Sequence, residues 1–131
     1  MRVCGIIAEY DPFHAGHAWQ IQAVRGILGA HTAVVCAMSG NWTQRGAPAL
    51  FPKHVRAQAA LLGGADLVLE LPSVWAVAPA ETFARGGVAL LDGTGVVTHL
   101  CFGSECGTLE PLQRAAHCLD SQLYTAGLRR F

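Results

Sequence analysis

Residues 5–21 read GIIAEYDPFHAGHAWQI, and this stretch contains the pattern that decides the fold. It begins with an apolar run typical of a buried strand and continues into a segment with helical spacing, which we expect to begin near Ala15. The same alternation continues along the chain. Strands are predicted over 2–8, 32–38, 66–71 and 96–102, and helices over 15–29, 53–63, 76–92 and 108–119. This order predicts an α/β fold with a doubly wound parallel sheet and helices on both faces.

Glycine and proline mark the ends of the predicted elements. Gly63 and Gly64 are expected to end the second helix, and Pro72 the third strand. The final segment, QLYTAGLRRF, has apolar residues at the spacing of an amphipathic helix but no capping residue after it. We therefore expect residues 1–131 to form one domain that continues beyond its C-terminal end in a longer protein.

The composition excludes several classes of protein. The chain has 131 residues, of which 52% are hydrophobic and 14% charged, and its formal net charge is zero. This composition is typical of a packed globular domain and removes any broad electrostatic attraction to nucleic acids or anionic membranes. We expect neither a membrane span, which needs an apolar run of ~18 residues, nor a signal peptide. The odd number of cysteines, five, indicates free thiols in a reducing, cytoplasmic environment.

His14, Gly16 and His17 form the strongest candidate site. They follow the first predicted strand, and ligands of open α/β sheets bind beyond the carboxyl ends of the strands. The free N–H groups at the start of the next helix favour a phosphate there. Gly16 lets an anion approach the backbone, and the three-residue spacing lets both imidazoles donate to one phosphate chain. Phosphate binding is the favoured interpretation; incidental polar residues, or a metal site with Glu9 or Asp11, are the alternatives. We assign no metal ligand.

A second group of polar residues lies in the loop SGNWTQRG, which follows the second predicted strand. Because parallel strands end at the same edge of a sheet, this loop is expected beside the histidine pair. Its donors suit a carboxylate, a phosphate or an RNA group, and the substrate candidates are Ser39, Asn41, Gln44 and Arg45. Lys53 and Arg56, in the first turns of the next helix, are expected on a solvated face, with a phosphate contact as the alternative.

The tetrapeptide HAGH, residues 14–17, resembles the H-x-G-H motif of the nucleotidyltransferase superfamily. Further stretches in the same order, covering nearly the whole chain, are similar to the tRNA(Met) cytidine acetate ligase family: GIIAEYDPFHAGH, MSGNWTQRGAPALFPKHVRAQAAL, GADLVLELP, APAETFARGGVALL and CFGSE. The resemblance implies a Rossmann-like (HUP-type) fold. It also implies that residues 1–131 are the N-terminal part of a nucleotidyltransferase-like catalytic domain.

The resemblance further implies an activity. Members of this family are bacterial, cytoplasmic ligases that use ATP to activate acetate as acetyl-adenylate and then acetylate N4 of the wobble cytidine of elongator tRNA(Met). The implied partners are ATP with Mg²⁺, acetate, and a tRNA bound largely by a later part of longer family members. His14 and His17 are the implied catalytic residues, holding the phosphates. The implied ATP-binding residues are Ile7, Ala8, Glu9, Tyr10, Asp11, Pro12, Phe13, His14, Ala15, Gly16, His17, Ala18, Trp19, Gln20 and Gly103.

Two positions depart from the family pattern. Asp11 stands where asparagine is usual, and Pro52 stands where an acidic residue is usual. A carboxylate at residue 11 repels phosphate unless magnesium or a neighbouring donor compensates its charge. Two other functions fit the motif: a small-molecule adenylyltransferase, and a nucleotide- or RNA-binding module without catalytic activity.

Overall fold

The computed structural model describes residues 1–128, and a four-stranded parallel sheet forms its centre. The strands are β1 (Val3–Ala8), β2 (Ala33–Ser39), β3 (Leu67–Leu71) and β4 (His99–Leu100), in the spatial order β3-β2-β1-β4. Because neighbouring strands are parallel, the chain must cross a face of the sheet between them, and helices supply these crossovers. The predicted α/β fold with a parallel sheet is confirmed.

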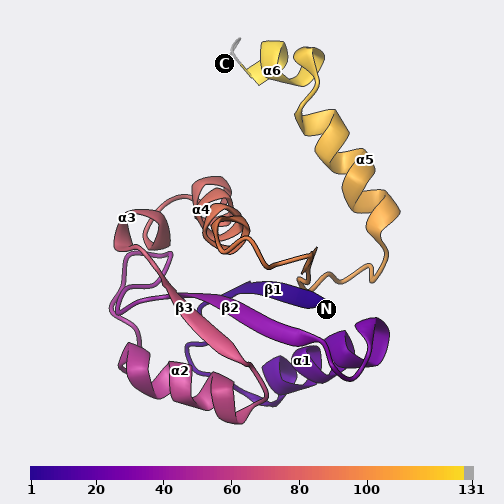
Figure 1. Ribbon diagram of the computed structural model, residues 1–131. Helices are drawn as coiled ribbons and strands as arrows, with labels where there is room; N and C mark the ends of the chain where they lie inside the picture. The colour runs from indigo at the N-terminus through magenta and orange to yellow at the C-terminus, as the bar shows by residue number, and fades with distance from the viewer. Residues whose placement is uncertain (129–131) are drawn as a thin grey trace.

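Helices cover both faces of the sheet, as predicted (Figure 1). On one face lie α1 (Ala15–Leu28) and α2 (Lys53–Leu62), and on the other lies α4 (Ala80–Gly93), with the short α3 (Ser73–Ala76) beside it. α5 (Leu109–Leu119) and α6 (Gln122–Leu128) extend away from the sheet. The predicted C-terminal helix is thus present up to Leu128, whereas Phe131, its last predicted apolar residue, lies outside the described residues.

The two faces of the sheet are buried in separate cores, because successive side chains of a strand point to opposite faces. Cys4 and Ile6 of β1 pack in the core that also contains Ile21 of α1. Val3, also in β1, packs in the other core with Leu91 of α4. The strands are therefore apolar on both sides, which explains their nearly continuous apolar runs.

Two predicted elements were wrong in their extent. The helix predicted over 76–92 begins only at Ala80, as α4, while the separate helix α3 ends at Ala76. Pro79 separates the two, because proline disfavours helical backbone in the residue before it and cannot donate an N–H. The strand predicted over 96–102 is reduced to His99–Leu100, an edge strand that pairs with β1. The ends predicted at Gly63 and before Pro72 are confirmed. Among residues 1–128, no helix combines the length and the apolar character that crossing a bilayer requires.

Candidate functional site

The segment that joins β1 to α1 turns sharply at Tyr10, whose backbone has a left-handed φ of 51°. Such a conformation costs a non-glycine residue about 1–3 kcal/mol, so the surrounding contacts must hold it. The Tyr10 side chain is buried, its hydroxyl lies 3.3 Å from Sγ of Cys36, and its ring packs edge-on against Phe13 with centroids 5.0 Å apart. Burial raises the pKa of the Tyr10 hydroxyl, so the hydroxyl stays protonated. The buried side chain holds the turn after β1 in place.

His14 and His17 hold the start of α1 through reciprocal hydrogen bonds. His14 is the N-cap, and its Nδ1 accepts from the N–H of Gly16 at 3.1 Å. In return, Nδ1 of His17 accepts from the backbone N–H of His14 at 3.2 Å. This is a capping box with histidine in both positions, and a capping box requires the three-residue spacing of the motif. The predicted start of the helix near Ala15 is confirmed.

The same hydrogen bonds orient both imidazole rings. Because Nδ1 of each ring accepts a backbone hydrogen bond, Nε2 is the nitrogen that carries the ring proton in both His14 and His17. The two rings are stacked with centroids 3.7 Å apart, and the Tyr10 ring supports His17 at a centroid distance of 4.8 Å. The pair therefore presents two neighbouring Nε2–H donors at the carboxyl edge of the sheet.

The environment keeps His17 neutral. Burial of the ring, and after it the proximity of His14, lowers the pKa of His17 from its ordinary value. A neutral ring is what the capping box needs, because a protonated imidazole has no free Nδ1 to accept the N–H of His14. Protonation of His17 in the folded protein must therefore break this hydrogen bond.

Acidification below pH 6.5, the ordinary pKa of histidine, is expected to destabilise the fold through His17. The pKa of His17 is lower in the folded protein than in the unfolded chain, so the unfolded chain binds more protons between the two values and stability falls as pH falls through that window. His17→Gln keeps a capping acceptor that does not titrate. Urea denaturation should therefore show a smaller loss of unfolding free energy for His17→Gln than for the wild type on acidification through this window. Equal losses of unfolding free energy in the two proteins would contradict the role assigned to His17.

The structure adds a reason for Gly16 that the sequence did not reveal. A Cβ at residue 16 would lie 3.0 Å from Cε1 and 3.1 Å from Nδ1 of His14. A side chain at this position would therefore press on the capping ring. Gly16 therefore leaves space for the His14 ring, and it also leaves the backbone at residue 16 accessible to a ligand.

A cavity of about 360 Å³, which we call the histidine cavity, opens beside the pair. Its lining residues come from the end of β1 and the segment after it, the first turns of α1 and the segment after β4, and they are Ile7, Ala8, Glu9, Tyr10, Asp11, Pro12, His14, His17, Gln20, Phe102 and Gly103. The volume is within the usual range of small-molecule sites. A Cβ added at Gly103 would meet no atom within 4 Å, so this residue borders open space.

Most of the predicted ATP-binding residues line the histidine cavity, but some do not. The remaining members of the predicted set are Phe13, Ala15, Gly16, Ala18 and Trp19. Phe102 was missed, although its position directly before Gly103, at the end of the fourth predicted strand, was an available signal.

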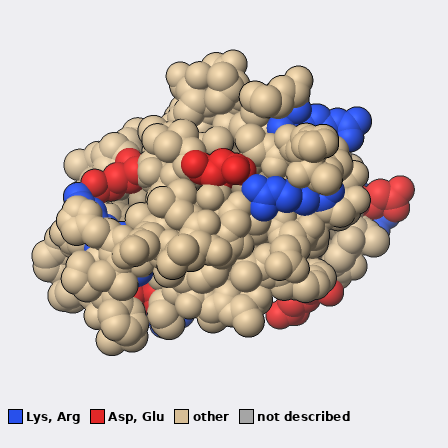
Figure 2. All heavy atoms as spheres, turned by 60° about the horizontal axis from the view of Figure 1, so that its bottom comes forward, with Lys and Arg blue, Asp and Glu red and all other residues tan. Residues whose placement is uncertain are grey.

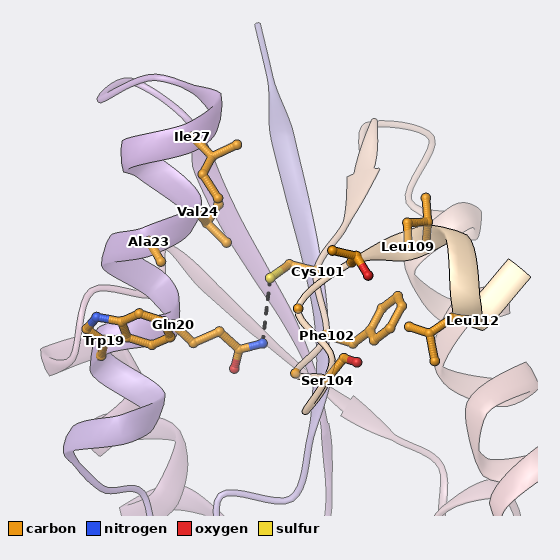
Figure 3. Close-up of a pocket in the computed structure, with 13 residues that line it drawn as sticks. Trp19, Gln20, Ala23, Val24, Ile27, Cys101, Phe102, Ser104, Leu109 and Leu112 are labelled. Atoms are coloured by element: carbon orange, nitrogen blue, oxygen red, sulfur yellow. Dashed lines mark hydrogen bonds between the residues drawn. The ribbon is translucent and has the colours of Figure 1, made fainter.

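A second cavity, of about 410 Å³, adjoins the first and shares Gln20, Phe102 and Gly103 with it. Figure 3 shows α1 on one side of this cavity and the segment after β4 on the other, with Nε2 of Gln20 3.6 Å from Sγ of Cys101. Its further side chains are largely apolar and include Trp19, Ala23, Val24, Ile27, Leu109 and Leu112. We call it the apolar cavity. The two cavities offer a polar end at the histidines and an apolar end along α1.

Two carboxylates of the histidine cavity accept hydrogen bonds from a neighbouring loop. Oε1 of Glu9 accepts from the N–H of Gln44 at 2.5 Å, and both oxygens of Asp11 accept from the N–H of Leu50 at 2.8 and 3.0 Å. A neighbouring donor therefore compensates part of the Asp11 charge. Within residues 1–128, no group of three or more His, Cys, Asp or Glu side chains is arranged to hold a metal ion.

The four substrate candidates do not line the histidine cavity. Ser39, predicted as a substrate candidate, is buried at the end of β2, and its Oγ has no hydrogen-bond partner within the described residues. Oδ1 of Asn41 accepts from the N–H of Lys53 at 3.3 Å, at the start of α2. Gln44 and Arg45 lie in the loop held beside the cavity, and Arg45 is exposed.

The predicted solvated face of α2 is wrong for Arg56. Its side chain is only 1% exposed, because the helical period turns it toward the sheet, where carbonyl groups at the strand ends accept its N–H donors. Lys53 is half-buried, and its Nζ lies 2.6 Å from Oε2 of Glu70.

Comparison with known proteins agrees with the fold and the motif. Residues 1–128 match the family model described as HIGH Nucleotidyl Transferase. The chain is 42% identical over 122 residues to the tRNA(Met) cytidine acetate ligase of Clostridium novyi (strain NT), and 50% identical over 119 residues to that of Alkaliphilus metalliredigens (strain QYMF). These alignments cover 93% and 91% of this chain, but 30% and 28% of the two relatives.

A solved structure is similar over the same region. The crystal structure of Thermotoga maritima TmcAL bound with alpha-thio ATP superposes with a TM-score of 0.84 and is 47% identical, covering 91% of this chain and 28% of that chain. The chain thus spans about 30% of the length of the curated relatives. Because the family model matches residues 1–128, including the paired histidines at the start of α1, the chain belongs to the HIGH nucleotidyl transferase family.

Proposed function

We propose that residues 1–131 are a nucleotidyltransferase-like domain that binds ATP and activates acetate, as part of a tRNA(Met) cytidine acetate ligase. The observation that carries the proposal is the pair of Nε2–H donors that His14 and His17 present beside the histidine cavity. Relatives with this name at 42% and 50% identity support the reaction class. The ATP analogue in the Thermotoga maritima structure supports the choice of nucleotide.

In the proposed first step, a carboxylate oxygen of acetate attacks the α-phosphorus of ATP. A bond forms between that oxygen and phosphorus, the bond from phosphorus to the oxygen that bridges to the β-phosphate breaks, and pyrophosphate leaves. His14 and His17 donate from Nε2 to phosphate oxygens and stabilise the charge that develops on them. In the second step, N4 of cytidine attacks the acetyl carbonyl and loses a proton, and AMP leaves. Neither step needs a covalent bond to the protein.

The adenosine is proposed to extend from the histidine cavity past Gly103 into the apolar cavity. The two cavities share Gln20, Phe102 and Gly103, so a ligand in one can continue into the other. A largely apolar space of about 410 Å³ suits the flat faces of a purine, while the polar end suits the phosphates.

Mg²⁺ is proposed to enter the site as the counterion of the triphosphate. The oxygens of Asp11 and one oxygen of Glu9 already accept backbone hydrogen bonds, so these carboxylates do not form a ready cage for a cation. Mg²⁺ in nucleotide enzymes is commonly held by phosphate oxygens and water with few protein ligands. The residues present fit an ion held mainly by the nucleotide.

The tRNA is proposed to bind mainly to parts of the longer protein that this chain does not include. The chain has a formal net charge of zero, and Figure 2 shows charged side chains in separate small groups on one face rather than as a continuous basic patch. Contacts of Lys and Arg with phosphates supply much of the affinity for nucleic acids. A cytoplasmic location, where tRNA and free thiols occur together, is part of the proposal.

Acetate-dependent exchange of labelled pyrophosphate into ATP tests the proposal. The chain is expected to catalyse this exchange with Mg²⁺ present. Gly103→Val is expected to weaken ATP binding by about tenfold or more, because the new side chain would fill space proposed for the nucleotide. Gly26→Val is the matched control, since Gly26 also borders open space but lines neither cavity. ATP binding without exchange would restrict the chain to nucleotide binding, and no ATP binding by the folded chain would contradict the proposal.

A further inference from the structure

Arg56 of α2 is a buried cation that backbone carbonyls hold on several sides. Among residues 1–128 it is the largest fully buried side chain, and only 1% of its surface is exposed. Its Nε donates to the carbonyl of Phe51 at 3.0 Å, and its two Nη atoms donate to the carbonyls of Glu9, Ser39 and Gly40. These carbonyls belong to the segment after β1, the end of β2 and the entrance to α2. One guanidinium therefore connects three segments at the carboxyl edge of the sheet.

The charge of Arg56 is not neutralised by a carboxylate. The ion pairs found within residues 1–128 are Arg25–Asp66 and Lys53–Glu70. Burying a charge without a counterion is costly, and a well-packed apolar side chain at such a position is often as stabilising or more so. The planar guanidinium, however, can donate to several carbonyls at fixed angles, which no apolar side chain can do. An arginine at this position is therefore better explained by the three segments that it joins than by a gain in the stability of the fold.

The end of β2 leads into a hairpin loop, residues 41–50, which has its own hydrogen bonds. The N–H of Ala49 donates to the carbonyl of Asn41, and the N–H of Thr43 donates to the carbonyl of Ala47, each at 2.9 Å. These bonds make the hairpin loop a defined structure rather than a loose connection.

The hairpin loop is attached to the wall of the histidine cavity. The Glu9 carboxylate accepts from Gln44, and the Asp11 carboxylate accepts from Leu50, at two separate points of the loop. Arg56 binds the carbonyl of Glu9 and so fixes the residue that holds one of these points. The cavity wall and the hairpin loop are thereby parts of one hydrogen-bonded unit.

We propose that Arg56 is a positioning residue that joins the nucleotide side and the second-substrate side of this site. By holding the backbone at Glu9 and at the end of β2, it keeps the hairpin loop attached to the wall of the histidine cavity through Glu9 and Asp11. The identities of the nucleotide and of acetate rest on the function proposed above, whereas the connection is a property of the chain itself. The role needs a guanidinium, because a lysine ammonium cannot reach all these carbonyls from one point.

Arg56→Lys, with Arg25→Lys as its matched control, tests this role. Arg25 also joins separate segments, through the carbonyl of Gly64 and the carboxylate of Asp66, but at the opposite edge of the sheet. Amide hydrogen exchange by NMR and ATP affinity by calorimetry are measured at a temperature at which circular dichroism shows each protein fully folded. In Arg56→Lys, exchange at the hairpin amides of Gln44 and Leu50 is expected to accelerate about tenfold or more, and ATP affinity to fall about fivefold or more.

Arg25→Lys is expected to lower the midpoint of thermal unfolding while both of these quantities keep their wild-type values. A role confined to stability predicts the same pattern for Arg56→Lys, so a lowered midpoint with unchanged hairpin exchange and ATP affinity would overturn the proposal. If the wild-type chain binds no ATP, the proposed function fails, while the exchange measurement still decides whether Arg56 holds the hairpin loop.

If Arg56→Lys does not fold, the hydrogen bonds from the Leu50 N–H to the Asp11 carboxylate supply a second test. Asp11→Ala is expected to accelerate exchange of the Leu50 amide about tenfold, whereas Asp11→Asn, which keeps an acceptor oxygen, is expected to keep it within about threefold of the wild type. Unchanged exchange of Leu50 in Asp11→Ala would show that the cavity wall does not hold the hairpin loop, and the proposal would fall with it.

Discussion

Replacing both His14 and His17 by alanine is expected to weaken ATP binding by about 100-fold or more. Each imidazole presents an Nε2–H beside the histidine cavity, and a hydrogen bond to a charged group contributes about 1.5–3 kcal/mol, so losing two of them gives a factor of at least this size. Calorimetric titration with ATP and Mg²⁺ measures the effect. The double variant also loses the cap of α1, which costs about 1 kcal/mol of stability.

A second double variant separates phosphate binding from helix capping. His14→Ser with His17→Gln recreates the usual S-x-x-Q capping box without imidazoles. It should restore the stability lost in the alanine variant but leave ATP binding weak. His31→Ala, an exposed histidine remote from both cavities, should bind ATP as the wild type does. Recovery of ATP affinity together with the cap would mean that the histidines act through the helix start and not through their Nε2–H groups.

Gly63→Ala is expected to destabilise the protein by about 1–3 kcal/mol, the usual cost of overpacking. A Cβ at residue 63 would lie 2.5 Å from Cε1 of Phe13 and closer still to Cζ, so the Phe13 ring must move. That ring packs against Tyr10 and His17, with centroids 5.0 and 5.5 Å apart, and it therefore helps to hold the histidine pair. ATP binding should weaken together with stability, as chemical denaturation and calorimetry can show.

Backbone preference predicts the opposite result, which makes this substitution informative. Gly63 has φ of −76° and ψ of −2°, a conformation that alanine adopts readily. Gly26→Ala, in the last turn of α1 with open space around it, should stabilise the protein by up to about 1 kcal/mol. Phe13→Ala should remove most of the effect of Gly63→Ala in a double-mutant cycle. If the effects of Gly63→Ala and Phe13→Ala on the free energy of unfolding were additive, the proposed clash between residue 63 and the Phe13 ring would be contradicted.

The order of strands and helices was predictable because it depends on short-range patterns. The apolar run of β1 and the helical spacing after His14 extend over a few residues each, and they located the first strand, the start of α1 and the site between them. The later start of the helix predicted over 76–92 also had a local signal, Pro79, which the periodicity of the surrounding residues obscured.

Other features of the site depend on contacts between distant parts of the chain. Arg56 is 47 residues from Glu9 in sequence, and its position in the first turns of a helix is as compatible with a solvated face as with burial. Glu9 and Asp11 are 35 and 39 residues from the backbone N–H groups that they accept from. No periodicity within an element encodes such pairs.

The residues of the motif and their spacing were sufficient to propose a phosphate site at the histidine pair and to place the pair at the edge of a parallel sheet. The structure decided how that site is built: the two rings together cap α1, the nearby carboxylates attach a hairpin loop, and Phe102, in the segment after β4, lines the cavity. The difference has a physical cause. Secondary structure and capping arise from neighbours within a few residues, whereas the partners of a buried guanidinium or a carboxylate are chosen only when the strands and helices come together.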